Sequence, residues 1–469
     1  MKFVNEKLEE FNNYIKNKKV AIIGLGVSNV PLIEYLHNLG SKITVFNNKP
    51  IDTLDNSILD KIYEYKIDYS FGENYLSKLN GFDIIFRTPS CRPDLPEIQK
   101  EIERGAILTS EIELVLKLCP GTTIGITGSD GKTTTTSLIY EILKEENLNC
   151  YLGGNIGIPL FTKIAEMKPE DYIILELSSF QLMNMDISPN IAVVTNIAPN
   201  HLDIHKSYEE YIQSKANIFR YQTEDDLLIL NYDNETTRNF AKVARSKIVY
   251  FSSKQKLENG FILDNGVIKE CENGLRRHII NNKNIKLRGI HNSENICAAI
   301  AATNKIASID SQIKAVSEFT GVSHRLEFVK EINGAKWYND SIASSPTRTI
   351  AGLNSFDENI ILIAGGYDKN LDYRPLAMPI INKVNKLILL GQTSDKIYQA
   401  VMELLKTNNK KLDIYKVASL EEAITKSKEI SEKGDVVLFS PASASFDMFK
   451  NFEERGNMFK QLVNKLLSE

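Results

Sequence analysis

A short glycine-containing segment carries the residue types that bind phosphate. It reads Thr127-Gly128-Ser129-Asp130-Gly131-Lys132-Thr133-Thr134 and stands between an apolar run, 122–126, and a segment with apolar residues at helical spacing. A loop between a strand and a helix leaves backbone N–H groups unpaired at the helix N-terminus, where the helix dipole also attracts anions. We therefore predict that this segment, the phosphate loop, binds a phosphate group.

The phosphate loop is a shortened form of a known pattern. The full P-loop has a glycine five positions before Gly131, where this chain has Ile126. In the remaining Gly-x-x-Gly-Lys-Thr, Lys132 would reach the outer phosphates and the Thr133 hydroxyl would bind Mg²⁺. The alternative is a polar helix start without a ligand, but a lysine at a helix N-terminus opposes the dipole unless an anion is present.

An acidic residue ends another predicted strand in the same region. The strand expected at 171–175 leads into Glu176. Carboxyl ends of parallel strands meet at one edge of a sheet, so we expect Glu176 beside the phosphate loop, binding Mg²⁺. A strand-end acid facing solvent is the alternative. Further on come His201, which alone is more often structural than a ligand, a capping-box sequence at Ser207 and a helix carrying Lys215.

Alternating strands and helices surround these residues along the whole chain. We predict an α/β fold with three domains: an N-terminal Rossmann-like domain (1–112), a central domain with a P-loop ATPase-like parallel sheet (113–321) and a C-terminal Rossmann-like domain (322–469). Ligands are expected at the carboxyl ends of the strands. In the last domain the expected strands are 359–364, 386–390 and 435–439.

The first domain opens with a second glycine-containing turn. Gly24-Leu25-Gly26-Val27-Ser28-Asn29 follows the apolar run 19–23. The dinucleotide fingerprint requires a third glycine where Asn29 stands and an acid where Asn47 ends the next strand. These two differences argue against an NAD-dependent oxidoreductase. A mononucleotide lying on the turn is compatible with the pattern, and so is a turn that only packs tightly.

Composition excludes several classes of protein. The 56 basic and 60 acidic residues among 469 nearly balance, so we expect no nucleic-acid partner. No apolar run reaches the ~18 residues of a membrane span, and the N-terminus lacks a signal-peptide pattern, so we expect no membrane and a cytoplasmic protein. The five cysteines lack CxxC spacing, which predicts reduced thiols and no zinc site.

Taken in order, the motifs resemble those of the Mur ligase family over essentially the whole chain. The matching features are the phosphate loop, Asn155-Ile156-Gly157, Glu176, His201 with Lys215, His291-Asn292-x-x-Asn295, His324-Arg325 and Asp340. Within the family, the sequences at 176–182, 440–447 and 451–456 are similar to those of the member that adds D-glutamate. The Asp-Asn-Pro-Arg motif of the diamino-acid-adding member and the His-Gly-Lys loop of the L-alanine-adding member are absent.

The resemblance implies an ATP-dependent amide ligase of peptidoglycan precursor synthesis. The implied substrates are small molecules: UDP-N-acetylmuramoyl-L-alanine, D-glutamate and ATP. The reaction would pass through an acyl phosphate and use two Mg²⁺ ions and a carbamylated Lys215. We expect a monomer.

The resemblance also implies a role for each matching residue. The catalytic residues would be Lys132, Glu176, His201 and Lys215, and the metal ligands Thr133, Glu176, His201 and Lys215. ATP would be bound by Gly128, Ser129, Asp130, Gly131, Lys132, Thr133, Thr134, Asn295, Arg325 and Asp340. The UDP substrate would be bound by Val27, Ser28, Asn47, Asn48, Asn155 and Ser178. D-glutamate would be bound by Lys369, Ser445, Phe446 and Phe452.

Three positions depart from the family pattern. Asn47 stands where an aspartate usually contacts uracil, Asp130 replaces the loop asparagine, and Ile342 stands where many members have lysine. We leave Ile342 out of the site for that reason. The rival interpretations are a folylpolyglutamate synthase, which would share Lys132 and Glu176, an NAD-binding oxidoreductase and a non-catalytic nucleotide sensor.

Overall fold

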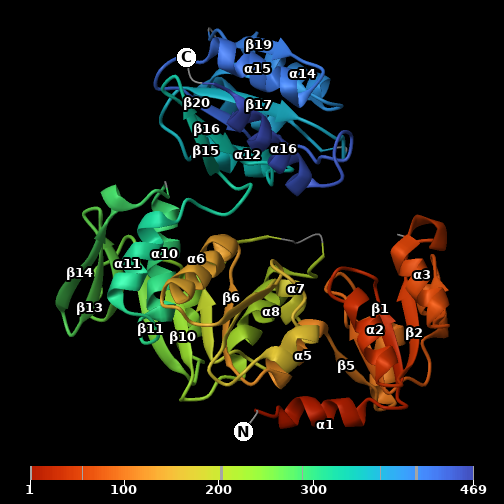
Figure 1. Ribbon diagram of the computed structural model, residues 1–469. Helices are drawn as coiled ribbons and strands as arrows, with labels where there is room; N and C mark the ends of the chain where they lie inside the picture. The colour runs from red at the N-terminus through yellow and green to blue at the C-terminus, as the bar shows by residue number, and fades with distance from the viewer. Residues whose placement is uncertain are drawn as a thin grey trace. The chain divides into compact units, whose positions relative to one another are not determined.

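The computed structural model describes residues 3–54, 56–200, 204–287, 289–369, 371–406 and 410–467. The chain divides into two compact units, Met1–Ile285 with Ile290–Phe319 and Lys286–Gly289 with Thr320–Glu469. The first unit holds two sheets and the second holds one, in the described residues (Figure 1). The predicted α/β class is confirmed, while the domain boundaries at 112 and 321 stay a prediction.

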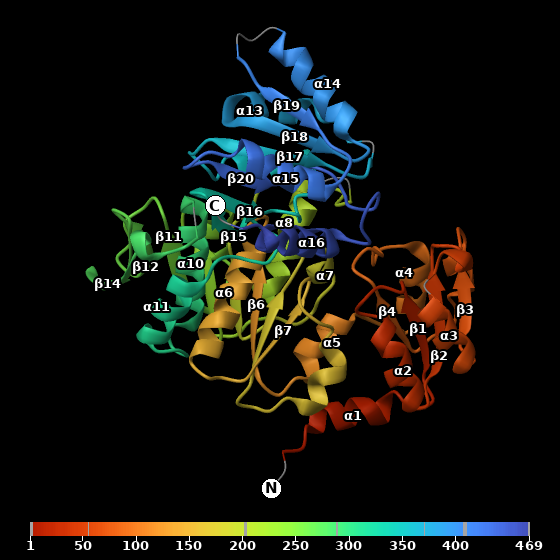
Figure 2. The same cartoon turned by 45° about the horizontal axis from the view of Figure 1, so that its top comes forward.

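The N-terminal sheet is parallel throughout, with strand order β3-β2-β1-β4-β5 (Figure 2). The order changes direction between β1 and β4, which makes the sheet Rossmann-like as predicted. Both faces of β1 are covered, since Val20, Ala21 and Ile22 are fully buried. The strands are β1 (Lys19–Ile23), β2 (Lys42–Asn47), β3 (Asp68–Phe71), β4 (Ile84–Arg87) and β5 (Ile107–Thr109).

The turn after β1 is closed by an asparagine. Gly24 has a φ of 83°, and a Cβ there would lie 2.5 Å from Thr88 Cγ2, so glycine is required. Asn29 Nδ2 donates hydrogen bonds to the carbonyl oxygens of Ile23 (3.1 Å) and Gly24 (3.0 Å). Asn29 precedes α2 (Val30–Asn38) and occupies the place of the missing third glycine. Its side chain therefore holds the turn in shape.

The central sheet has strand order β14-β13-β12-β11-β10-β9-β6-β8-β7. From β7 to β12 the pairing is parallel, as predicted, and β13 and β14 extend the sheet in antiparallel pairing. The strands are β6 (Thr122–Thr127), β7 (Cys150–Gly154), β8 (Tyr172–Glu176), β9 (Ile191–Val194), β10 (Leu227–Asn231), β11 (Lys247–Ser252), β12 (Gly260–Asp264), β13 (Val267–Glu272) and β14 (Leu275–Asn281).

Helices cover this sheet and place two of the motifs. α6 (Lys132–Glu145) packs against both α10 (Ile290–Thr303) and α11 (Ile309–Glu318) (Figure 2). α8 (Tyr208–Arg220) is capped by Ser207, as predicted, since its Oγ accepts a hydrogen bond from the Glu210 backbone N–H (3.1 Å). The Glu210 carboxylate accepts from the backbone N–H of Lys206 (2.7 Å), the residue before the cap, where a capping box would use the N–H of Ser207.

The C-terminal sheet has strand order β15-β16-β20-β17-β18-β19, in which only β15 is antiparallel to its neighbour among the described strands. The three predicted strands correspond to β17, β18 and β20, whereas β15, β16 and β19 were not predicted. The strands are β15 (Glu327–Ile332), β16 (Ala335–Asn339), β17 (Ile360–Gly365), β18 (Val384–Leu390), β19 (Asp413–Lys416) and β20 (Val436–Phe439). The last helix in the described residues is α16 (Phe452–Lys465).

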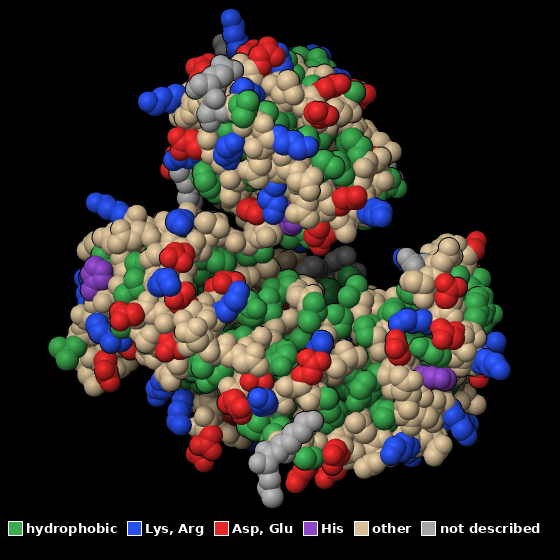
Figure 3. Space-filling model, viewed as in Figure 1, with side chains coloured by type: hydrophobic (Ala, Val, Ile, Leu, Met, Phe, Trp, Pro, Cys, Tyr) green, Lys and Arg blue, Asp and Glu red, His purple; other side chains and the backbone are tan. Residues whose placement is uncertain are grey.

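The distribution of surface charges and the state of the cysteines are as the composition indicated. On the face drawn in Figure 3, acidic and basic side chains are interspersed. All five cysteines are free thiols. No helix in the described ranges has both the length and the apolar character to cross a membrane.

Candidate functional site

The phosphate loop has a backbone that only glycine permits at two positions. Gly128 and Gly131 have φ values of 150° and 80°. A Cβ at Gly128 would lie 1.9 Å from Thr195 Oγ1, and one at Gly131 would lie 2.2 Å from Asn295 Oδ1. Helix α6 begins directly after Gly131, so its first N–H groups, including those of Thr133 and Thr134, have no helical carbonyl partner. The loop therefore has the geometry of an anion-binding site.

Thr195 and Asn196, which directly follow β9, hold the phosphate loop in place. Thr195 Oγ1 donates to the Asp130 carbonyl oxygen (2.5 Å), and Asn196 Nδ2 donates to the same oxygen (3.1 Å). Asn196 Oδ1 accepts from the Asp130 backbone N–H (3.0 Å), and the Asn196 carbonyl accepts from the Ser129 N–H (2.8 Å). Sequence reasoning missed both residues, although a polar pair directly after the apolar run 191–194 was an available signal.

Lys132 reaches back over the loop. Its Nζ donates to the carbonyl oxygens of Gly128 (2.8 Å) and Ser129 (3.0 Å). The Ser129 hydroxyl is itself fixed, donating to the Ala198 carbonyl (2.9 Å) and lying 2.8 Å from the Tyr211 hydroxyl. The ammonium group is thus held at the loop that we predict to bind phosphate.

Asn295 comes to the loop from α10. Its Oδ1 accepts from Thr135 Oγ1 (3.4 Å), and its Nδ2 donates to Asn292 Oδ1 (3.1 Å). The side chain is buried and lies against Gly131. The structure therefore brings this predicted ATP residue to the start of α6.

Glu176 lies at the carboxyl end of β8, in register with Ile126 of β6. Its side chain is 1% exposed. Oε1 accepts from Asn155 Nδ2 (2.8 Å), but Oε2 is buried and accepts no hydrogen bond from the described residues. An unsatisfied buried carboxylate oxygen is costly, and a bound cation would satisfy it. This orphaned oxygen beside the phosphate loop fits the predicted magnesium site.

Lys215 comes from α8 and is buried against the same loop. Nζ donates to the Gly128 carbonyl (2.8 Å) and to Thr127 Oγ1 (3.2 Å), and it lies 4.9 Å from the centroid of the Tyr211 ring. Burial lowers the pKa of this amine well below its ordinary value, and the charge of Lys132 lowers it further. The structure thus unites the phosphate loop, Glu176 and Lys215.

His201 lies outside the described residues. A neighbouring histidine that sequence reasoning missed, His205, is stacked on Phe180, with 5.1 Å between ring centroids. Its Nε2 lies 2.9 Å from Ser179 Oγ, and its Nδ1 lies 3.5 Å from Glu210 Oε2. Within the described ranges, no group of three or more His, Cys, Asp or Glu side chains is arranged to hold a metal ion. The predicted metal ligands are not such a group, because they include the hydroxyl of Thr133 and the side chain of Lys215.

The residues predicted for the UDP substrate lie at strand ends in the first unit. Val27, which is 78% exposed, and Ser28 are on the turn after β1. Asn47 ends β2 and is buried, and Asn48 follows the strand and is exposed. Asn155 follows β7 and bonds Glu176, as described above. Ser178 caps the short helix α7 (Ser179–Leu182) in a capping box with Gln181.

A buried arginine joins the N-terminal sheet to the segment after Glu176. Arg87, at the end of β4, donates from Nη2 to the Phe180 carbonyl (2.7 Å) and from Nε to Asn184 Oδ1 (2.7 Å). Burial lowers the pKa of its guanidinium to about 10. Sequence reasoning missed Arg87, because Phe180 and Asn184 lie more than ninety residues away from it and leave no local signal.

In the second unit, Asp340 is a buried acid directly after β16. Oδ1 accepts from the Leu326 backbone N–H (3.2 Å), and Oδ2 accepts from Ser440 Oγ (2.7 Å). Burial raises the pKa of this carboxyl to about 7, against the opposing influence of its hydrogen bonds and of Arg325. Arg325 lies between His324 and Leu326, whose φ values are 67° and 45°.

We expect Asp340→Asn to stabilise the second unit more at pH 8 than at pH 5. The folded pKa lies above the ordinary 3.8, so the folded state binds the proton more tightly and stability falls as pH rises from 3.8 to about 7. At ~1.4 kcal/mol per pKa unit the effect reaches a few kcal/mol. Thermal unfolding followed by fluorescence of Trp337, the only tryptophan and buried on β16, measures it. A pH-independent difference would contradict the prediction.

The residues predicted to bind D-glutamate lie after β17 and β20 and at the start of α16. Lys369 Nζ lies 5.2 Å from the centroid of the Phe446 ring, which is 57% exposed. Ser445 is buried next to it. Phe452 begins α16 and meets the His324 ring edge-on at 6.1 Å. The structure thus pairs Lys369 with Phe446.

Two family models match the chain. "Mur ligase middle domain" matches residues 126–303, and "Mur ligase, glutamate ligase domain" matches residues 324–443. A curated protein of Acetivibrio thermocellus, UDP-N-acetylmuramoylalanine--D-glutamate ligase, is 52% identical over 465 residues, covering 99% of this chain and 100% of that protein. The protein of the same name from Clostridium tetani is 50% identical over 463 residues, with the same coverage.

Solved structures show the same fold at low identity. UDP-N-acetylmuramate-alanine ligase MurC of Thermotoga maritima aligns with a TM-score of 0.57 at 19% identity, covering 95% of this chain and 99% of that chain. MurF of Acinetobacter baumannii aligns with a TM-score of 0.58 at 14% identity, covering 97% and 92%.

Proposed function

The chain belongs to the Mur ligase family, and from this premise we propose that it is an ATP-dependent ligase joining D-glutamate to UDP-N-acetylmuramoyl-L-alanine in peptidoglycan precursor synthesis. One observation carries the assignment: curated relatives of that name are about half identical over their full length. The substrates are small molecules, and we propose a cytoplasmic monomer.

The phosphate loop, 128–134, binds the phosphates of ATP in this proposal. Three features support this assignment: the positive φ values of Gly128 and Gly131, the N-terminus of α6 and the ammonium group of Lys132, all in the same loop. Asn295 faces the adenine, and Arg325 and Asp340 bind the nucleotide from the second unit. Lys132 neutralises charge that develops on the transferring phosphoryl group.

Magnesium would be held at the same loop. Thr133 and Glu176 would bind one ion, a role supported by Glu176 Oε2, which accepts no hydrogen bond from the described part of the chain. His201 and Lys215 would bind a second. When bound, the ions neutralise phosphate charge during transfer.

Lys215 would serve as a carbamate. Its buried position beside Gly128 and its lowered pKa favour the neutral amine, which is the form that reacts with carbon dioxide. An ammonium would repel a metal ion, whereas a carbamate supplies the anionic oxygen that Mg²⁺ prefers.

The amide bond would form in two steps. Val27, Ser28, Asn47 and Asn48 hold the uridine nucleotide, and Asn155 and Ser178 orient the muramoyl-alanine arm. Its carboxylate attacks the γ-phosphorus of ATP, giving an acyl phosphate and ADP. Lys369, Ser445, Phe446 and Phe452 hold D-glutamate, whose amine then attacks the acyl carbon and releases phosphate.

One assay tests the function. We expect phosphate release from ATP only when UDP-N-acetylmuramoyl-L-alanine and D-glutamate are both present, with L-glutamate as the matched control. Release that depends on a folate and L-glutamate would favour the folylpolyglutamate synthase, and ATP binding without release would favour the nucleotide sensor. Either result would overturn the proposal.

A further inference from the structure

Arg455 of α16 is a buried guanidinium that none of these roles uses. Its side chain is 2% exposed. Nη1 donates to the carbonyl oxygens of Ser443 (3.1 Å) and Ala444 (2.9 Å). Nε donates to Ser341 Oγ (3.0 Å), and Nη2 donates to the Ser341 carbonyl (2.8 Å). One side chain therefore makes four hydrogen bonds to two separate loops.

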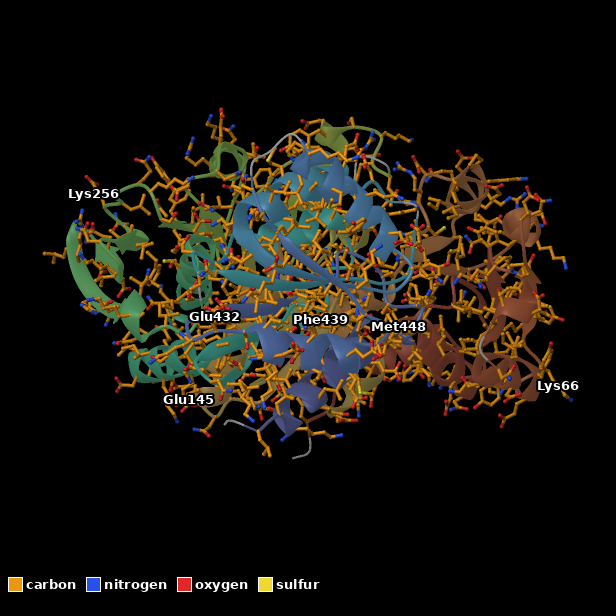
Figure 4. The ribbon with its side chains drawn as sticks, turned by 90° about the horizontal axis from the view of Figure 1, so that it is seen from above. Lys66, Glu145, Lys256, Glu432, Phe439 and Met448 are labelled. Carbon is orange, nitrogen blue, oxygen red and sulfur yellow. The ribbon has the colours of Figure 1, made fainter. Side chains whose placement is uncertain are left out.

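These loops follow β16 and β20, which are adjacent parallel strands. The carboxyl ends of parallel strands are where α/β sheets bind ligands. The guanidinium lies 5.9 Å from the ring centroid of Phe439, the last residue of β20, which Figure 4 labels. Ala442, in the second loop, has a φ of 58°, a conformation that is costly for a residue other than glycine. Arg455 thus holds a strained loop at the ligand-binding edge of the sheet.

The held loop is tied to the predicted D-glutamate residues. Ser445 and Phe446 directly follow Ala444, whose carbonyl also accepts from the Tyr367 backbone N–H (2.9 Å), two residues before Lys369. The same hydrogen-bond network reaches Phe452, the fourth predicted D-glutamate residue, because Ser341 Oγ donates to the Phe452 carbonyl (2.8 Å). The guanidinium of Arg455 therefore sets the relative positions of all four predicted D-glutamate residues.

The cost of burying Arg455 points to such a role. Its four acceptors are carbonyls and a hydroxyl, and none is a carboxylate. Burial of this charge costs several kcal/mol, which the neutral acceptors and the nearby charge of Asp447 offset in part. The planar fork of arginine offers the fixed set of donors that these loops require, and lysine does not.

We propose that Arg455 is a positioning residue for the amino-acid substrate, acting through the loops that carry Ser445 and Phe446 and not by touching the substrate. The inference rests on the proposed function. It concerns how D-glutamate is held, and it leaves the binding of the UDP substrate unchanged.

Steady-state kinetics of Arg455→Lys and Arg455→Ala test this inference. We expect the KM for D-glutamate to rise at least ~10-fold in both variants, equivalent to ~1.4 kcal/mol. We expect kcat at saturating D-glutamate to stay within about threefold and the KM for the UDP substrate to be unchanged. Low concentrations of guanidinium should lower the raised KM of Arg455→Ala toward the wild-type value. Arg374→Ala is the matched control, because Arg374 is exposed and pairs only with Asp372 among the described residues.

Each other outcome overturns the inference. A wild-type KM in Arg455→Lys would show that charge alone suffices. The KM values for D-glutamate and for the UDP substrate could instead rise equally, and the unfolding transition followed by Trp337 fluorescence could move to a lower temperature. That result would show that Arg455 has only a structural role. Wild-type protein without D-glutamate-dependent phosphate release overturns the proposed function as well, whereas unchanged variants of an active enzyme overturn only this inference.

Discussion

Replacing Lys132 by methionine is expected to lower kcat for ADP release by ~10³-fold or more while the protein stays folded. The ammonium is held at the phosphate loop by Gly128 and Ser129, where it can neutralise the transferring phosphoryl group. Removal of one such transition-state donor costs ~10²–10³-fold in other enzymes, and a full positive charge contributes more. A coupled assay for ADP at saturating substrates measures the loss.

The fold should survive because Lys132 is only partly buried, and its two hydrogen bonds contribute about 1 kcal/mol each. Lys144→Met is the control on the same helix: Lys144 is exposed and lies 5.7 Å from the Tyr140 ring centroid. We expect its turnover to match the wild type. Normal turnover in Lys132→Met would refute the phosphate-loop assignment.

Lys215→Ala should be inactive and should regain activity with added small carboxylates such as formate or acetate. The substitution removes the side chain that bonds Gly128 and Thr127 and leaves space beside the loop. A carboxylate entering that space would supply the anionic oxygen otherwise given by the carbamate. Phosphate release measured against carboxylate concentration should rise and saturate.

Lys215→Arg is the matched control for this rescue. A guanidinium stays charged and cannot be carbamylated, so this variant should be inactive with or without carboxylate. Full activity of Lys215→Ala without rescue would mean that Lys215 only fills space in α8. A folded Lys215→Ala protein that no carboxylate rescues would contradict the carbamate.

Local pattern was sufficient for the elements that carry the phosphate loop and Glu176. Apolar runs of strand length predicted β1, β6 and β8 closely, because buried parallel strands are apolar on both faces. The same rule failed for β15 and β16, whose apolar residues are interrupted by charged or polar ones, and which join at Asn333-Gly334. Asn265-Gly266 and Asn273-Gly274 turn two further hairpins, so Asn-Gly was an overlooked signal.

Periodicity, glycine spacing and residue order were enough to predict the strand–loop–helix around Gly128 to Thr134, the acid at the end of β8 and the family motifs. The distant side chains that come together at those places depend on how the chain folds. Lys215 meets Thr127 across 88 residues, and Asn295 meets Thr135 across 160. Arg87 likewise meets the Phe180 carbonyl across 93 residues, and Arg455 meets the Ser341 carbonyl across 114. Every residue has a backbone carbonyl, so the residue type does not indicate which carbonyl will accept a hydrogen bond from a buried guanidinium or amine. The folded structure is needed to identify these acceptors.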